Sequence, residues 1–446
     1  MEGKLVVTIS EIRNQEPDFI SGESWRYTAK SHIAVVDAED SGDPQVLTEG
    51  FYSACSPSVS FDGARLLFAA RKEQKDSWQI WEMELSSRKV KQITSSSENS
   101  IDPVYLPGDK VVFSRMIEND SLKSGHSLFS CNLDGSGLTR LTFNPNTYFA
   151  PVILKDGRIV AITRQVYPEK GQPSLMVLRP DGTKCELFYG ENNGAELAGR
   201  LAERSNGSIF FTEYDKHIAG KINLVSISYR RPLHSKTIVL SPSDFIFCSV
   251  SDYNDANLLV TGRKGNEKIA LYEFDGEKQS VGRKIFEDVT GDVLEAVTIR
   301  AYQRPKKLPS EVDMGVKTGL LLCQNINLTG LQSPDKASDL KNADRIEIVG
   351  VDSSLGVVKV QADGSVYLKI AADTPFRIKT MDKDHKVIGG PGTWLYLRPN
   401  ERRGCVGCHE DQEIAPANRY ALAVGKNPVS VPVHYSGIKE KEVELE

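Results

Sequence analysis

The feature that most constrains the fold of this chain is a turn-plus-strand unit that recurs through its first three hundred residues. In four copies, which occupy residues 61–68, 107–113, 155–161 and 205–211, a turn containing Gly precedes a short apolar run. The turns lie near positions 62, 108, 156 and 206, so successive copies are 46 to 50 residues apart. This spacing matches one four-stranded blade of a β-propeller. The sequence therefore predicts a ring of such blades, in which each blade needs its neighbours to cover its apolar faces.

Each unit continues into a second strand and closes on an apolar residue followed by Thr. Apolar and polar residues alternate along the second strands, as in residues 81–85, which is typical of a strand with one packed face. The closing pairs are Leu47-Thr48, Ile93-Thr94 and Leu141-Thr142. With a partial unit before residue 48 and a later unit through residues 258–276, the count is about six blades. We expect the ring to close where residues 5–9 pair with residues 294–299.

A different β region follows, because the repeat is lost after a linker at residues 305–309. Asp363-Gly364 is expected to be a hairpin turn between two strands of a small antiparallel β-sandwich. We therefore expect an all-β chain with a propeller at residues 1–305, a middle β-sandwich at residues 310–400 and a short third segment at residues 401–446. The strand-like runs of the middle region are residues 319–323, 345–351, 357–360, 366–370 and 394–397.

Charge and hydropathy exclude two classes of partner. The formal net charge is -5, and the numbers of acidic and basic residues are nearly equal. The chain therefore lacks the excess of basic residues that is typical of a protein that binds nucleic acid. No stretch approaches the roughly 18 consecutive apolar residues that a membrane-spanning helix needs. We expect neither a nucleic-acid partner nor a membrane span.

The third segment carries the chemistry, at Cys405-Val406-Gly407-Cys408-His409. Two thiols separated by two residues can form thioethers to one haem, and the next residue then presents its imidazole to the iron. This spacing predicts one covalent haem c, anchored by Cys405 and Cys408 and ligated by His409. Half of a zinc site would want a second ligand pair, and a thioredoxin-like dithiol would follow a βαβ pattern rather than β strands.

The other five of the seven cysteines show no metal or disulfide spacing, so we interpret them as buried small side chains. The sixth position of the iron is open to several interpretations. It is either open or closed by a His or Met side chain, and a Met ligand would raise the reduction potential. The candidates are His434, His385, His126, His217, Met381 and Met314, whereas no feature recommends His32 or His234.

Several charged residues lie next to the motif in the sequence, and their role has two interpretations. Glu413, with Glu410 and Asp411, lies either in a solvated charged turn or in the iron pocket, where Glu413 would bind or move protons for a redox substrate. On the second interpretation, Glu413 is the candidate catalytic residue. Arg402 and Arg403 could pair with the haem propionates or remain ordinary surface arginines.

Haem c attachment takes place outside the cytoplasm, so we expect a periplasmic or extracellular protein. The chain opens with Met1-Glu2-Gly3-Lys4, which lacks the charged start and apolar core of a secretion signal. Our expectation is that such a signal has been removed.

Five segments of the chain carry a resemblance to a known family when they are taken in order. They are Asp102-Pro103-Val104-Tyr105-Leu106-Pro107, Asn132-Leu133-Asp134-Gly135-Ser136-Gly137-Leu138-Thr139-Arg140-Leu141-Thr142, Lys155-Asp156-Gly157-Arg158-Ile159, Arg403-Gly404-Cys405-Val406-Gly407-Cys408-His409-Glu410 and Ala415-Pro416-Ala417-Asn418-Arg419. Together they resemble the hydrazine synthase alpha-subunit family, whose members join a TolB-like propeller to a middle β domain and c-type haem. The resemblance covers most of the chain and implies a six-bladed propeller with a haem that performs redox chemistry on small nitrogen compounds.

The chain departs from that family at two points. The family is expected to carry a Tyr four residues beyond the haem histidine, and that position is Glu413 here. This sequence also contains no second Cys-x-x-Cys-His, whereas the family extends into a second haem domain. Hydrazine synthesis itself is therefore not expected.

Three functions remain open on the sequence. The first is a haem redox protein that acts on a small molecule within a complex, with a redox partner protein or other subunits. The second is an electron-transfer cytochrome whose propeller docks a partner. The third is a propeller adaptor with a structural haem.

Overall fold

The computed structural model describes residues 3–11, 27, 29–39, 42–117, 125–190, 197, 199–215, 217–239, 245–328, 342–407, 413 and 420–432. Within these residues the chain is all-β, apart from a single 3₁₀ turn, η2, at Leu422–Gly425. It divides into two compact units. The first contains Met1–Pro180 and Glu186–Leu308, and the second contains Asp181–Cys185 and Pro309–Glu446.

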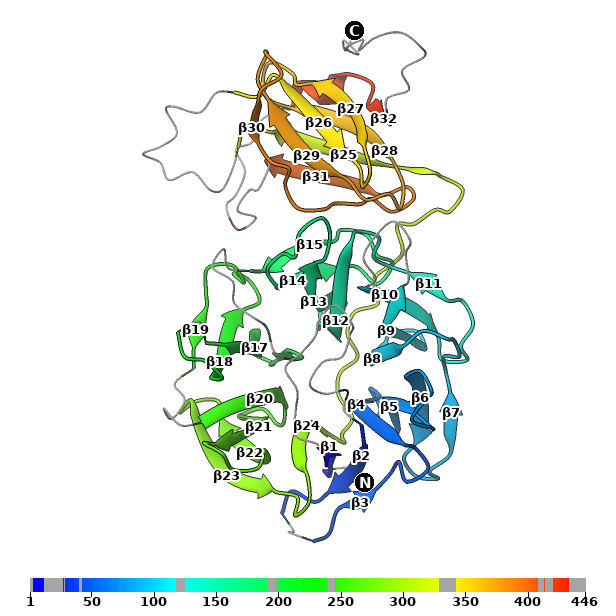
Figure 1. Ribbon diagram of the computed structural model, residues 1–446, viewed down its shortest axis with the longest axis vertical. Coiled ribbons are helices and arrows are strands. Elements are labelled where there is room, and N and C mark those ends of the chain that lie inside the picture. Colours follow the sequence, from blue (N-terminus) through cyan, green and yellow to red (C-terminus); the bar gives the residue numbers. More distant parts are fainter. Residues whose placement is uncertain are drawn as a thin grey trace. The chain divides into compact units, whose positions relative to one another are not determined.

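The first unit is a six-bladed propeller, as the sequence predicts (Figure 1). Each blade is a four-stranded antiparallel sheet. The first blade has the order β24-β1-β2-β3, and the others run in chain order from β4 to β23. The strands are β1 (Leu5–Ser10), β2 (Ser31–Val36), β3 (Gln45–Val46), β4 (Ser53–Val59), β5 (Arg65–Arg71), β6 (Gln79–Glu84), β7 (Val90–Gln92), β8 (Ser100–Leu106), β9 (Lys110–Ile117), β10 (Gly125–Asn132), β11 (Thr139–Arg140), β12 (Asn146–Ile153), β13 (Ile159–Gln165), β14 (Ser174–Leu178), β15 (Glu186–Tyr189), β16 (Ala202–Glu203), β17 (Ser208–Tyr214), β18 (Ile222–Ser228), β19 (Thr237–Ile238), β20 (Phe245–Asp252), β21 (Asn257–Lys264), β22 (Ala270–Asp275), β23 (Ser280–Phe286) and β24 (Asp292–Thr298).

The ring closes by pairing strands from its two ends. β24 lies antiparallel to β1, with Leu5 opposite Thr298 and Ser10 opposite Asp292. The predicted closure is confirmed. Because β24 supplies the edge strand of a blade begun by β1, neither end of the propeller exposes an unpaired strand there.

The repeated apolar-Thr pairs have a structural role in the outer part of the blades. In three blades, the threonine side chain accepts a hydrogen bond from a backbone N–H of the third strand, close to the short fourth strand. These bonds join Ile33 to Thr48 at 2.9 Å, Ile80 to Thr94 at 2.8 Å and Leu128 to Thr142 at 3.0 Å. The hydroxyl thus satisfies a buried donor that the short strand leaves unpaired.

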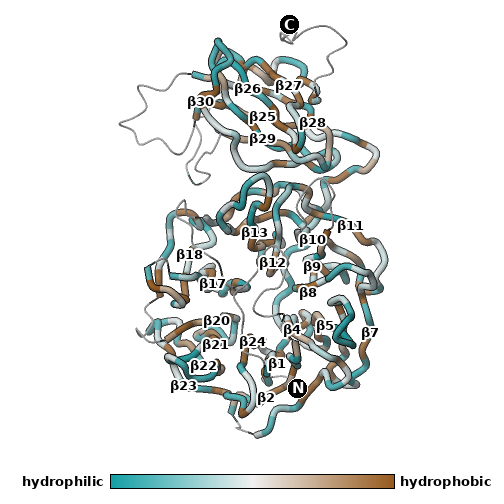
Figure 2. The backbone as a smooth tube through the Cα atoms, in the orientation of Figure 1, coloured by the Kyte–Doolittle hydropathy of each residue, from teal (hydrophilic) through white to brown (hydrophobic). Residues whose placement is uncertain are grey.

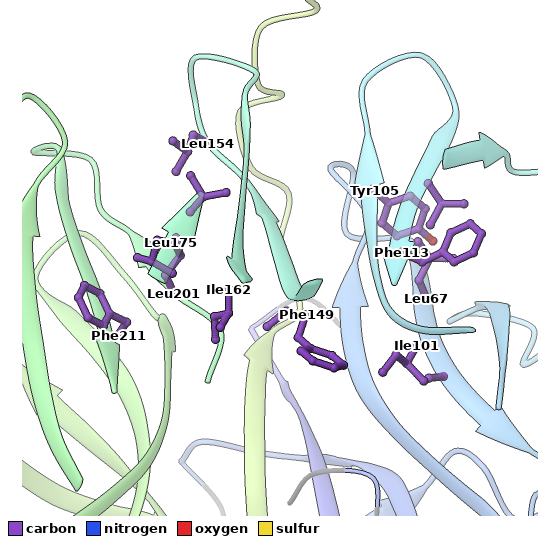
Figure 3. Packing of buried hydrophobic residues seen from close by; sticks show 14 of the residues in the cluster. Leu67, Ile101, Tyr105, Phe113, Phe149, Leu154, Ile162, Leu175, Leu201 and Phe211 are labelled. Atoms are coloured by element: carbon purple, nitrogen blue, oxygen red, sulfur yellow. The ribbon is translucent and has the colours of Figure 1, made fainter. Parts of the chain in front are cut away.

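One apolar cluster runs from blade to blade and joins the sheets. Leu67, Phe113, Phe149, Ile162 and Phe211 belong to it and come from five different strands (Figure 3). Many propeller strands are buried along their length, as in β1, because each sheet is covered on both faces.

The second unit is a sandwich of two four-stranded sheets, ordered β31-β25-β28-β32 and β27-β26-β29-β30. Burial alternates along its strands, and Figure 2 shows the matching alternation of hydropathy. One face of each sheet therefore builds the core. The strands are β25 (Thr318–Asn325), β26 (Arg345–Val349), β27 (Ser354–Lys359), β28 (Val366–Ala371), β29 (Arg377–Met381), β30 (Val387–Gly389), β31 (Arg402–Gly407) and β32 (Val429–Val431).

Three expectations for this region are wrong in detail. The sandwich is not purely antiparallel, because β25 pairs in parallel with β31 and β28 with β32. Asp363-Gly364 is a turn, with Gly364 at φ +84°, but it joins β27 to β28, which lie in different sheets. Residues 394–397 form no strand and contribute one isolated bridge, from Leu395 to Phe376.

The turn was misread because local residue types predict a reversal of the chain and not the strand that pairs after it. The inward-facing residues of β27 and β28 are packed into the same core. They reach it from opposite sheets.

Candidate functional site

The first half of the Cys-x-x-Cys-His motif lies on β31, an edge strand of the sandwich. Cys405 is in parallel register with Cys323 of β25 and packs against the hydrophobic core of the unit. Gly407 ends the strand, where a Cβ atom would lie 2.2 Å from the carbonyl oxygen of Leu328, so the position directly before Cys408 requires glycine. Cys408 and His409 lie outside the described residues.

Cys405 differs from the other cysteines of the described residues in its exposure. Cys55, Cys131, Cys185, Cys248 and Cys323 are all buried, which agrees with the interpretation made from the sequence, whereas Cys405 is partly exposed. Burial raises the pKa of the Cys131 thiol to about 11 and that of Cys248 to about 12. Those two thiols are therefore poor nucleophiles at neutral pH.

There is also room beside the motif. Gly404 is exposed, and no atom of the described residues other than its chain neighbours lies within 4 Å of the point where its Cβ would stand. The strand therefore combines a partly exposed cysteine with an open position on its opposite face.

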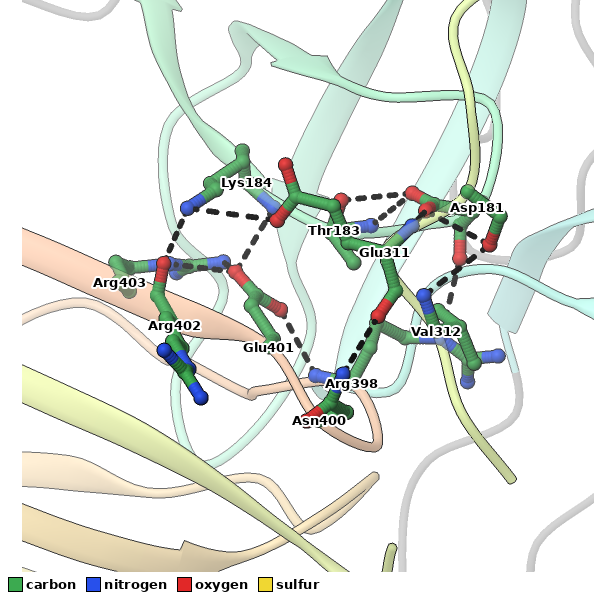
Figure 4. A network of polar contacts seen from close by, with 11 residues as sticks. Asp181, Thr183, Lys184, Glu311, Val312, Arg398, Asn400, Glu401, Arg402 and Arg403 are labelled. Carbon is green, nitrogen blue, oxygen red and sulfur yellow. Dashed lines mark hydrogen bonds and ion pairs between the residues drawn. The ribbon is translucent and has the colours of Figure 1, made fainter. Parts of the chain in front are cut away.

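A buried ion pair holds the start of β31 in place (Figure 4). The Glu401 carboxylate accepts hydrogen bonds from Arg403 Nε at 3.0 Å and from a second Arg403 nitrogen at 2.7 Å. Glu401 also accepts from the Arg398 backbone N–H at 2.8 Å. Although burial alone would lower it, the charge of Glu401 raises the pKa of Arg403. Because Arg403 forms a buried ion pair with Glu401, it is not an ordinary surface arginine. The Glu401 carboxylate already neutralises the charge of its guanidinium.

The segment Asp181–Cys185 belongs to this unit and completes the network. The Cys185 carbonyl accepts a hydrogen bond from Arg403 at 3.2 Å, and the Gly182 carbonyl accepts one from the Tyr396 hydroxyl at 3.0 Å. Arg398 donates to the Asp181 carbonyl at 3.2 Å. These bonds join a turn that is distant in sequence to the segment directly before the motif, so they position Cys405.

The histidines proposed as iron ligands have different environments. His126 is fully buried in the propeller, with its ring 4.9 Å from that of Phe149. Burial lowers its pKa to about 4. His217 and His385 are exposed, and His434 lies outside the described residues.

The other candidate residues are placed as follows. Met381 is buried, Met314 is exposed, and Glu413 is partly buried, with the residues on both sides of it outside the described part. Glu410 and Asp411 also lie outside it. Among the described residues, no group of three or more His, Cys, Asp or Glu side chains could hold a metal ion.

The propeller contains a second candidate site, a cavity of about 470 Å³ lined by residues of all six inner strands. Its wall combines apolar residues, such as Val59 and Val250, with a few charged ones. Arg300 forms an ion pair with Asp252 there, and burial raises the pKa of Asp252.

Sequence reasoning missed this cavity, although a signal for it was present. Ser56, Asp102 and Ala150 each precede a proline on an inner strand, and all three have positive φ, at 59°, 55° and 49°. Each lies at an irregularity in strand pairing that turns its backbone out of the ladder.

Buried carboxylates accept the N–H groups that these irregularities free. Glu295 accepts the Ser56 N–H at 2.6 Å, and Asp102 accepts the Ala150 N–H at 2.8 Å. Arg200 lies 3.6 Å from the Asp102 carboxylate and donates to the Pro57 carbonyl at 3.2 Å. The recurring pairs Ser56-Pro57, Asp102-Pro103 and Ala150-Pro151 therefore indicate, in the sequence, three of the inner strands that line the cavity.

Fold and motif together define a class: a six-bladed propeller and a β-sandwich in one chain, with a Cys-x-x-Cys-His motif that begins on an edge strand of the sandwich. The hydrazine synthase alpha subunit middle domain family matches residues 326–410. Hydrazine synthase subunit alpha of Kuenenia stuttgartiensis is 21% identical and covers 82% of this chain. The chain in turn spans 61% of the length of that relative.

Solved structures resemble this chain over most of its length or over part of it. Kuenenia stuttgartiensis hydrazine synthase matches with a TM-score of 0.81 and 18% identity, over 95% of this chain and 72% of that chain. A nidogen/laminin complex matches with a TM-score of 0.50 and 10% identity, over 67% of this chain and 99% of that chain. TolB from Acinetobacter baumannii matches with a TM-score of 0.47 and 14% identity, over 66% of each chain. The resemblance to the hydrazine synthase alpha-subunit-like family is confirmed, and the likeness in structure extends over both units.

None of the described segments forms a helix long and apolar enough to span a bilayer.

Proposed function

We propose that this chain carries one haem c, bound through thioethers to Cys405 and Cys408 with His409 as iron ligand, and that it acts as a redox protein outside the cytoplasm. The observation that carries the proposal is the partial exposure of Cys405 on an edge strand, while the other five cysteines of the described residues are buried. The neighbouring Gly404 is exposed, and it leaves the opposite face of the strand open. A bound haem would supply electron exchange and a site for a small molecule.

The residues of this chain have separate parts in that proposal. Cys405 and Cys408 anchor the group, and the Glu401–Arg403 pair positions β31 so that the motif starts from a rigid strand. Glu413 takes the place of the tyrosine expected in the family and would hold or move a proton for a redox substrate.

We infer the class of substrate and of partner from the name of the matched relative. The matched protein is called a hydrazine synthase subunit, so its name implies small nitrogen compounds and an assembly. For this chain we propose redox chemistry on a small, possibly nitrogen-containing compound within a complex. An electron-transfer role, with the propeller docking a partner, is the alternative.

The first test is covalent haem attachment. The chain should be exported in a host that matures c-type haem, and haem should be detected on the denatured protein by absorbance and by intact mass. We expect one haem in the parent chain and in Cys131→Ala, and loss of the double thioether in Cys405→Ala and Cys408→Ala. A parent chain that matures without haem contradicts the proposal.

The second test separates enzyme from electron carrier. Absorbance and electron paramagnetic resonance spectra should be recorded with and without nitric oxide or hydroxylamine. A high-spin iron that shifts on ligand addition supports catalysis. A low-spin iron unmoved by either ligand supports electron transfer, and Glu413→Gln would then leave the pH dependence of turnover with a partner unchanged.

A further inference from the structure

Two cysteines of the sandwich stand directly opposite each other on neighbouring strands. Cys323 of β25 and Cys405 of β31 are partners in a parallel register that runs from Leu320 and Arg402 to Asn325 and Gly407. Neighbouring strands lie about 4.8 Å apart. Disulfide-bonded cysteines have Cα atoms about 4.4–6.8 Å apart, so the pairing brings this couple within the range of a disulfide.

The two side chains also share a face of the sheet. Side chains opposite each other in register point to the same side, and both cysteines pack in the same hydrophobic core. Cys323 is 3% exposed, as is usual for the inward positions of β25, while Cys405 is partly exposed. Cys405 is therefore the partly exposed member of the pair, and Cys323 lies next to it inside the core.

We propose that Cys323 and Cys405 form a disulfide in the chain before haem is attached. The oxidant is a small disulfide such as oxidised glutathione. The Cys405 thiolate attacks it and releases one reduced glutathione, and Cys323 then displaces the second glutathione from the mixed disulfide. Two thiols lose their protons, one S–S bond forms between the strands, and one oxidised glutathione becomes two reduced molecules.

The disulfide would control the haem site, and this second step rests on the proposed function. A sulfur atom held in a disulfide with Cys323 cannot form a thioether. Haem attachment at Cys405 would therefore require prior reduction of the bond between β25 and β31. Cys323 would thus decide whether Cys405 can react with haem, although it lies far from the motif in sequence.

The disulfide is tested first, on the full-length haem-free chain. The chain should be made without haem maturation, treated with oxidised glutathione, alkylated in the folded state and digested without reduction for mass spectrometry. We expect a linked pair of peptides that contain Cys323 and Cys405, and the same link in Cys131→Ser as a matched control. An alkylated Cys405, or a link from Cys405 to Cys408, overturns the proposal.

Control of the haem site is tested on the same material. Reduced and oxidised chain should be offered to the haem maturation system, and we expect attachment to the reduced chain, none to the oxidised chain, and recovery after reductant is added. Equal attachment to both overturns the control step. If haem attaches to neither, the proposed function fails, while the peptide map still decides whether the disulfide forms.

Discussion

At the scale of single residues, the position of the haem motif depends on charges buried just before it. Glu401 is fully buried, and its carboxylate accepts hydrogen bonds from the Arg403 guanidinium and from the backbone N–H groups of Arg398 and Lys184. A buried pair is costly to form, but removing one partner leaves the other charge without compensation.

The Glu401–Arg403 pair can be tested by removing one partner. We expect Arg403→Ala to lower the free energy of unfolding of the second unit by about 3–5 kcal/mol, because Glu401 stays buried without its cation. Arg402→Ala is the matched control, since its side chain is exposed, and should change stability by less than about 0.5 kcal/mol. Urea unfolding of the haem-free chain measures both. Equal effects of the two variants would contradict the role given to Arg403.

The buried histidine of the propeller predicts a loss of stability in acid. Burial lowers the pKa of His126 from its ordinary value of 6.5 to about 4. The unfolded chain therefore binds a proton at this residue as the pH falls below 6.5, before the folded chain does. The stability that neutral His126 contributes is present above pH 6.5 and lost on the way down to pH 4, by roughly 3 kcal/mol at 1.36 kcal/mol per pH unit.

The measurement is the free energy of unfolding between pH 7 and pH 4, for the parent chain and for His126→Phe. Phenylalanine keeps the contact with Phe149 and does not titrate. We expect the parent to lose more stability than the variant as the pH falls. A difference between the two proteins that stays constant over this range would show that the imidazole is not held neutral by burial.

At the scale of elements, side chains complete hydrogen bonding where the outer strands are too short. Thr94 accepts from the Ile80 N–H and donates to Gln79 at 2.9 Å, so one hydroxyl joins the end of a blade to its third strand. This explains why the sequence repeats an apolar-Thr pair.

The role of that hydroxyl is tested by a pair of substitutions at one position. Thr94→Val keeps the shape but leaves the buried Ile80 N–H without its acceptor, and should cost about 1–3 kcal/mol of propeller stability. Thr94→Ser keeps the hydroxyl and should cost less. Thermal or urea unfolding of the two variants compares them, and equal losses would mean that the lost methyl contacts matter more than the hydrogen bond.

At the scale of the whole molecule, the two units are not two consecutive segments of chain. Asp181–Cys185 lies in sequence between β14 and β15 of the propeller but belongs to the second unit. Three of its backbone carbonyls accept hydrogen bonds from Tyr396, Arg398 and Arg403.

Residues 309–446 made alone should therefore be less stable than the same unit within the full chain. The isolated piece lacks the three carbonyl acceptors, and each lost bond should cost about 1 kcal/mol. Hydrogen exchange of the β25 and β28 amides, in the isolated piece and in the full chain, measures the difference. Equal protection would show that Asp181–Cys185 contributes nothing to the second unit.

The sequence by itself determined the architecture of the first unit and the place of the motif. Six blades and an all-β chain follow from local signals that repeat, namely turns containing Gly, alternating strands and apolar-Thr ends, while the closure of the ring was expected from the positions of its first and last strands. Cys405, Cys408 and His409 are adjacent in the chain, so their spacing alone was enough to predict haem attachment, which stays a prediction.

Only the tertiary structure decided which distant residues meet. It placed Cys323 opposite Cys405, brought the Cys185 carbonyl to Arg403, assigned Asp181–Cys185 to the second unit and put β27 and β28 in different sheets. The physical reason is that local residue types set turns and strand periodicity, whereas strand partners and ion pairs depend on how the apolar faces of separate segments are buried together.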